Sequence, residues 1–165
     1  MASFSDLILY FESLAASHKK ILHTAEKKHF FRMELDEVLS GINRRDVNYP
    51  LFIMEGYGFN FTDNNSDNLL KNRSGAFMLI QHVPDITNFS KISEAWDEME
   101  EIATDILVKI YADKRSREVD VVRHFDFSSV NASLLRNQVG KDLGIRIEYA
   151  ITSPVQNDVN PDNWL

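Results

Sequence analysis

Two stretches of the chain carry apolar residues at the spacing of an amphipathic helix. In residues 4–23 the apolar positions recur every three or four residues, and Ser3 or Ser5 is placed to cap the first turn. Lys91–Ala112 carries an unbroken apolar stripe, with acidic residues in its first half and basic residues at its end. This charge order suits the helix dipole. We therefore expect helices over both stretches, with Ser90 capping the second.

Four other stretches show the alternation that is typical of β-strands. They are Leu51–Thr62, Ser74–Val83, Glu118–Val130 and Leu143–Thr152. One face of the first strand is expected to hold Leu51, Ile53, Tyr57, Phe59 and Phe61, interrupted by Glu55. Apolar residues on both faces of the second strand indicate a central strand that is covered on both sides.

The segments between these elements predict shorter or irregular structure. His29–Arg32 is expected to be a strand fragment or a turn, and Glu34–Leu39 one or two helical turns. Residues 63–73 predict a polar loop, and Asn131–Asp142 a loop or hairpin region.

The order of the elements predicts an α+β fold. Two hairpins form a mostly antiparallel four-stranded sheet, packed against the N-terminal helix and one long central helix. We expect a single domain over residues 1–152, followed by an extended C-terminal arm over residues 153–165. The edges of this sheet stay open unless another chain covers them.

Composition removes several classes of function. The chain has 18 basic and 25 acidic residues, hence a net charge of −7, which argues against a general binder of nucleic-acid backbones. It has no cysteine, so thiol catalysis, disulfides and cysteine-based metal sites are excluded. With neither a long apolar run nor a signal peptide, we expect a protein that does not enter a membrane.

The chemistry-bearing residues do not form a recognisable catalytic motif. The five histidines lack zinc-site spacing, and Asp63, Asn65 and Asp67 match a calcium loop only at its first positions. We therefore expect no enzyme activity, no cofactor and no metal ion. The acidic series on the long helix is interpreted as a docking or channel-lining surface rather than a catalytic one; it comprises Glu94, Asp97, Glu98 and Glu101.

The candidate partner interface lies in the polar loop and in the C-terminal arm. It comprises Asp63, Asp67, Lys71, Arg73, Pro161, Trp164 and Leu165. A tryptophan at the end of a polar arm is a typical anchor in a partner's pocket. The alternative is that Trp164 and Leu165 fold back onto their own domain.

The chain resembles the tail terminator family of long-tailed bacteriophages. The resemblance covers roughly residues 4–152 and is carried by element order, size and acidity. It depends on Tyr49-Pro50-Leu51-Phe52-Ile53, Gly75-Ala76-Phe77-Met78-Leu79-Ile80 and Leu143-Gly144-Ile145-Arg146-Ile147-Glu148-Tyr149. The closing segment 158–165 also looks like the end of phage or prophage structural proteins of Bacteroidetes-type hosts.

The resemblance implies a structural role in the virion. Such proteins assemble as a ring, typically a hexamer, on the last ring of the tail tube, end tube polymerisation and present a docking surface to the head connector. The expected partners are thus other copies of the chain, the tail tube protein and the connector, while DNA passes through without specific binding. The expected location is the tail or neck of the virion, and the host cytoplasm during assembly.

Three alternatives remain open from the sequence. A head–tail connector or neck protein also forms rings and has arms. A non-viral protein-binding module would instead be a monomer or dimer. A small enzyme on a ferredoxin-like scaffold would need a pocket with convergent polar groups.

Overall fold

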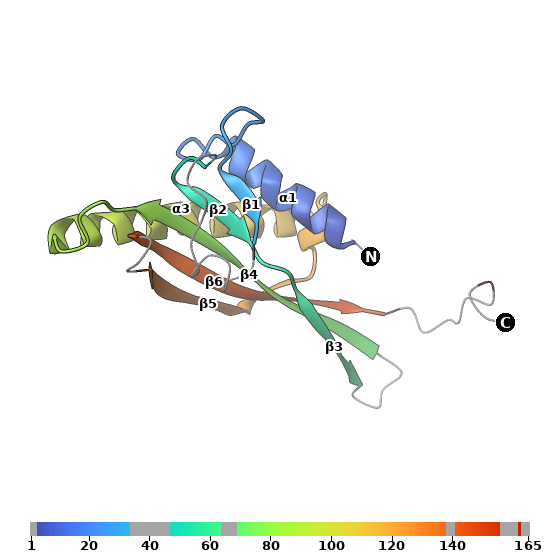
Figure 1. Ribbon diagram of the computed structural model, residues 1–165. Helices are drawn as coiled ribbons and strands as arrows, with labels where there is room; N and C mark the ends of the chain where they lie inside the picture. The colour runs from blue at the N-terminus through green and yellow to red at the C-terminus, as the bar shows by residue number, and fades with distance from the viewer. Residues whose placement is uncertain (1–2, 34–46, 64–68, 138–140, 156–161, 163–165) are drawn as a thin grey trace.

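Two helices lie on one face of a mixed β-sheet (Figure 1). The computed structural model describes residues 3–33, 47–63, 69–137, 141–155 and 162. Within these residues the helices are α1 (Phe4–Ser17) and α3 (Phe89–Ser116). The strands are β1 (Phe30–Arg32), β2 (Leu51–Met54), β3 (Gly58–Asp63), β4 (Leu69–His82), β5 (Phe125–Asn137) and β6 (Asp142–Pro154). A short 3-10 helix, η2 (Asp120–Val122), joins α3 to β5.

The α+β class is confirmed, but the sheet is larger than predicted and not purely antiparallel. It has six strands in the order β1-β2-β4-β6-β5, with β3 pairing with β4 beyond the end of β2. β1 runs parallel to β2, with Phe30 opposite Phe52, whereas the other pairs are antiparallel. The single strand expected over residues 51–62 is two strands, because the chain leaves the ladder between Met54 and Gly58.

The predicted ends of the helices also need correction. The first helix stops at Ser17 rather than at residue 23, because His18 adopts an extended backbone conformation. Ser3 caps its start and forms a reciprocal capping box with Asp6. The long helix is longer than predicted, and its cap is Asn88 instead of Ser90.

One segment predicted as a loop forms a strand: β4 already begins at Leu69, inside the expected polar loop 63–73. For residues 131–142, expected to be a loop or a hairpin, the structure shows the hairpin, because β5 continues to Asn137 and pairs with β6. The strand expected from residue 118 begins instead at Phe125, after η2. The helical turns expected over residues 34–39 lie outside the described residues.

An aromatic cluster joins α1 to the sheet. Phe11 is fully buried, and its ring lies 5.9 Å from that of Phe52, 5.5 Å from that of Phe77 and 5.6 Å from that of Tyr149. Burial of one such side chain contributes about 1.5–3 kcal/mol to stability. The stripe of α3 covers the same face beside α1, through Met99, Ile102, Ala103, Ile106 and Ile110.

The other face of the central strands is also covered, as the sequence predicts for the second strand. Leu51, Ile53, Met78 and Ile80 are buried there. Partly buried residues of neighbouring segments pack over them: Phe31, Met33, Val47, Tyr49 and Leu135. The sheet is therefore a middle layer around β2 and the second half of β4.

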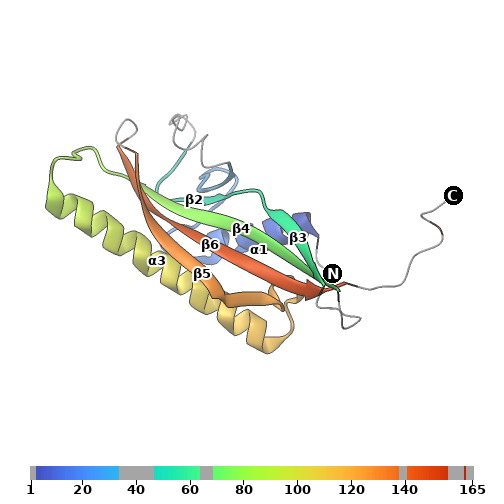
Figure 2. The same cartoon turned by 90° about the horizontal axis from the view of Figure 1, so that it is seen from below.

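The strands extend beyond the helices at one end of the molecule. Figures 1 and 2 show β3, the start of β4 and the end of β6 continuing past α1. We call this part the projecting ribbon; it comprises residues 58–63, 69–74 and 150–154.

Gly144 provides a test of the central pairing. A Cβ atom added there would lie 2.2 Å from the carbonyl oxygen of Leu79 on β4, closer than packed atoms approach. We expect Gly144→Ala to lower the free energy of unfolding by about 1–3 kcal/mol or more, measured by urea denaturation. Gly58→Ala is the matched control, because its Cβ would meet nothing within 4 Å. Equal effects of the two substitutions would contradict this prediction.

Candidate functional site

The projecting ribbon exposes two aromatic side chains on the side that the helices cover elsewhere. Phe59 is 57% exposed and Phe61 is 53% exposed, and their rings meet edge to face at 5.8 Å. The ammonium group of Lys71 lies 3.9 Å from the centre of the Phe59 ring, a cation–π contact. Paired exposed aromatics on a strand that projects from the body are typical of an interaction surface.

The structure brings together three of the predicted interface residues. In the register of β3 with β4, Phe59 lies opposite Arg73, Phe61 opposite Lys71 and Asp63 opposite Leu69, so Asp63, Lys71 and Arg73 share this face. Arg73 is buried, whereas the prediction placed it in an open loop. The other predicted residues, Asp67, Pro161, Trp164 and Leu165, lie outside the described residues.

The sequence did not identify Phe59 and Phe61 as surface residues. Their alternation with polar residues predicts a buried strand face, and no local signal shows where helix cover ends. The sequence feature that indicates a change at this point is the pair Gly56 and Gly58. These glycines interrupt the apolar series where the chain leaves β2 for β3.

The predicted acidic surface lies along α3 and is partly paired within the chain. Lys20 Nζ donates to Glu101 at 2.7 Å, and Ser90 Oγ donates to Glu94 at 3.1 Å. The hydrogen bond from Lys20 to Glu101 raises the pKa of Lys20, and nearby Glu98 adds to this shift. Asp97 is exposed on the adjacent strip of the helix. The surface is therefore acidic, but less so than the sequence suggests.

The other end of α3 is basic. Lys114, Arg115, Arg117 and Arg123 line an open hollow of ≈ 640 Å³. Lys114 Nζ donates to the carbonyl oxygen of Phe125 at 2.7 Å, which ties the end of the helix to β5. α3 is thus acidic near its start and basic at its end.

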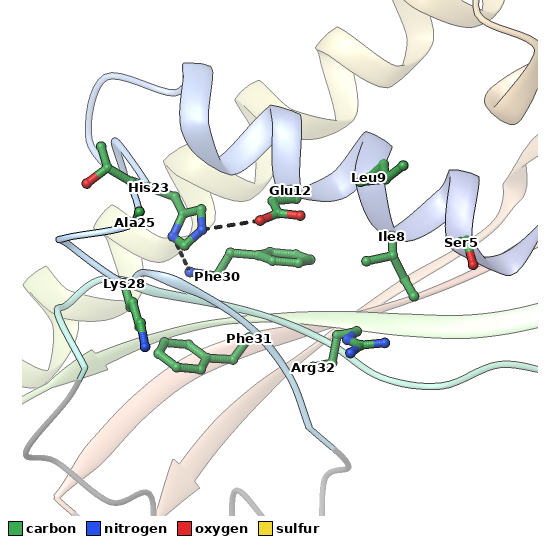
Figure 3. A pocket seen from close by; sticks show the side chains of 11 residues that line it. Ser5, Ile8, Leu9, Glu12, His23, Ala25, Lys28, Phe30, Phe31 and Arg32 are labelled. Atoms are coloured by element: carbon green, nitrogen blue, oxygen red, sulfur yellow. Dashed lines mark hydrogen bonds and ion pairs between the residues drawn. The ribbon is translucent and has the colours of Figure 1, made fainter.

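A larger hollow of ≈ 850 Å³ lies between α1 and β1, and we call it the α1–β1 hollow (Figure 3). Ile8 and Phe30 line its interior, and Lys28 and Arg32 flank it. β1 is the outermost strand of the described sheet on this side, so its outer backbone edge adjoins the hollow.

His23 in this hollow has a structural role. Its Nδ1 accepts hydrogen bonds from the backbone N–H groups of His29, at 3.0 Å, and Phe30, at 3.1 Å. Nε2 therefore carries the ring proton, and it lies 3.5 Å from a carboxylate oxygen of Glu12. Because both ring nitrogens are engaged, His23 is not poised as a general base.

A largely buried ion pair lies on the opposite face of the sheet. Arg146 on β6 binds Glu55 through two parallel hydrogen bonds, Nε to Oε1 at 2.6 Å and the second guanidinium nitrogen to Oε2 at 2.8 Å. Arg146 also binds Glu148, and this contact lowers the pKa of Glu148. Glu55 occupies the break between β2 and β3, so the pair fixes that break to β6.

The part of the chain that the structure describes shows neither a metal site nor a membrane-spanning helix. Within the described residues, no group of three or more His, Asp or Glu side chains is arranged to hold a metal ion. None of the helices described is both long enough and apolar enough to cross a membrane. Comparison with the models of known protein families and with the sequences of characterised proteins finds no match.

The substitution Glu55→Ala is expected to lower the free energy of unfolding substantially. It leaves the half-buried guanidinium of Arg146 with Glu148 alone, and we expect a loss of about 3 kcal/mol in the free energy of unfolding by urea denaturation. Glu101→Ala, which breaks the exposed pair with Lys20, is the control and is expected to cost less than about 1 kcal/mol. A similar cost for both would show that the Glu55 pair does not hold the strand break.

Proposed function

We propose that the chain is a structural protein that closes into a homo-oligomeric ring at the head-proximal end of a phage tail tube. In this role it ends tube polymerisation and offers the docking surface for the head connector. The projecting ribbon with exposed Phe59 and Phe61 is the observation that carries the proposal. The resemblance to tail terminator proteins supplies the identity of the partners.

The described residues favour assembly over catalysis. The carboxylate of Glu55, which is buried, and the guanidinium of Arg146 are paired with each other across the sheet. His23 in the α1–β1 hollow is held by backbone groups. Exposed phenylalanines, by contrast, leave apolar surface in water, which a second chain would cover.

The occupant that we assign to this surface is a second copy of the chain. A ring closes when one patch of each subunit meets a different patch of its neighbour. The α1–β1 hollow is the complementary patch: Ile8, Leu9 and Phe31 of its lining would receive Phe59 and Phe61, and Glu12 would face Lys71. The outer edge of β1 would offer backbone groups to the edge of the incoming ribbon.

The acidic surface of α3 has a separate role in this proposal. Around the ring axis, Glu94, Asp97 and Glu98 would repel the phosphates of DNA and let it slide through without binding. The proposed location is accordingly the tail or neck of the virion.

Loss of the two ribbon aromatics is expected to abolish the ring. We expect wild-type protein to give closed rings of about six copies by native mass spectrometry and negative-stain imaging, and the double variant Phe59→Ser, Phe61→Ser to stay monomeric. Because both side chains are exposed, each substitution should change the free energy of unfolding by no more than about 0.5 kcal/mol. Phe89→Ser is the control, because Phe89 is exposed on α3 away from the ribbon.

Rings that persist in the double variant would exclude the ribbon as the interface. Wild-type protein that stays monomeric at all concentrations is to be mixed with assembled tail tubes. Capping of the tubes supports a terminator, and failure to bind the tubes removes that function.

The absence of cysteine makes the contact between neighbours directly testable. A chain that carries Phe61→Cys together with Ser5→Cys, which lines the α1–β1 hollow, should form disulfide-linked ladders up to the ring number under oxidation. Each single variant should stay unlinked, because a head-to-tail contact brings different patches together. Efficient dimers from Phe61→Cys alone would instead show a symmetric pair and contradict the ring.

A further inference from the structure

A small polar pocket lies at the root of the projecting ribbon, apart from the α1–β1 hollow. It has a volume of ≈ 190 Å³ and is formed where β4 and β6 meet the segment around η2. Arg73 of β4 and Ser153 of β6 line its wall, and Asp120, Arg123 and His124 line it from the other side. A space of this size accommodates one small polar group rather than a metabolite.

Two buried polar atoms in this pocket lack a partner. Arg73 is 8% exposed and Ser153 is 4% exposed. The Nε of Arg73 and the Oγ of Ser153 are buried without a hydrogen bond. Buried polar groups in native proteins are almost always hydrogen-bonded, and one without a partner lowers stability, more so when it is charged. Two such atoms in one pocket therefore point to a missing acceptor.

The charges around the pocket indicate the charge of the group that would bind there. The carboxylate of Asp120 lies 3.5 Å from a guanidinium nitrogen of Arg123, so these two charges offset each other. The Arg73 guanidinium lies 5.8 Å from the centre of the Tyr57 ring, which carries no charge. Arg123 also lines the adjoining basic hollow with Lys114, Arg115 and Arg117. The surroundings are therefore net positive.

We propose that this pocket binds an oxyanion group of the size of a carboxylate or a phosphate. Arg73 donates from Nε–H and Ser153 donates from its hydroxyl, while Arg123 and the exposed His124 stand at the mouth. A group with several acceptor oxygens satisfies both orphaned donors and neutralises Arg73 in one step. The proposal does not depend on ring formation, because every residue that it uses belongs to one copy of the chain.

The direct test follows the Nε–H signal of Arg73 in proton–nitrogen NMR spectra. Sodium phosphate and sodium acetate are titrated separately, each at constant ionic strength against sodium chloride. We expect a saturable shift of this signal and a rise in melting temperature of about 3–6 °C at tenfold excess over Kd. Saturation with phosphate assigns the group to a phosphate, and stronger saturation with acetate assigns it to a carboxylate.

Substitutions at the two donors separate binding from general charge effects. Arg73→Met should raise Kd at least about tenfold, and Ser153→Ala should raise it severalfold. Without added anion, Arg73→Met should melt at or above the wild-type temperature, because it removes an unpaired buried charge. Lys19→Met, at an exposed lysine just after α1, makes the same change in net charge and should bind as wild type.

Three results would overturn the proposal. One is that the Nε–H signal of Arg73 does not saturate with either anion. The titration is carried up to the concentration at which chloride alone alters the spectrum. Another is an unchanged response in Arg73→Met. The third is a loss of binding in Lys19→Met equal to that in Arg73→Met, which would show non-specific screening.

Discussion

The antiparallel pairing of β4 with β6 is the constraint on which the rest of the structure depends. All thirteen residues of β6 are joined to β4 in one register, from Asp142 opposite His82 to Pro154 opposite Leu70. A slip by one residue would move Ile145, Ile147 and Tyr149 from the helix-covered face to the opposite one. The close approach at Gly144 admits no side chain in this register, so packing and pairing specify the same alignment. The ribbon, the ion pair of Glu55 with Arg146 and the oxyanion pocket all follow from it.

Regular patterns along the chain predict the parts of the fold that bury a continuous face. The stripe of α3 and the alternation in β6 suffice to place those elements, because each signal repeats over many residues. The strand over Leu69–Arg73 was missed because its residues are mostly polar, and their ladder partners come from β3 and β6. The break at Glu55 depends on Arg146, more than ninety residues away, and no local pattern reveals such a partner.

The candidate surfaces differ in how far they are visible in the sequence. The acidic series on α3 is apparent from its composition, but its pairing with Lys20 follows from the turn that ends α1. Arg73 looks like an ordinary loop residue in the sequence. Its importance comes from burial beside Ser153, which lies eighty residues later and reaches Arg73 only through the sheet. Sites that join distant segments by strand pairing are therefore the least accessible to sequence reasoning.

The position of β6 in the sheet has a consequence for the timing of assembly. β6 is the last strand of the described sequence, yet it lies between β4 and β5 in the middle of the sheet. A ribosome must therefore release residues up to Pro154 before the central ladder can close, although α1 and β4 emerge much earlier. Until then one backbone edge of β4 lacks its neighbour, and the ribbon has no third strand to hold its shape. The interface that we propose on that ribbon would therefore be formed only by chains whose synthesis has passed β6. In that case, nascent chains would not join a growing assembly too early.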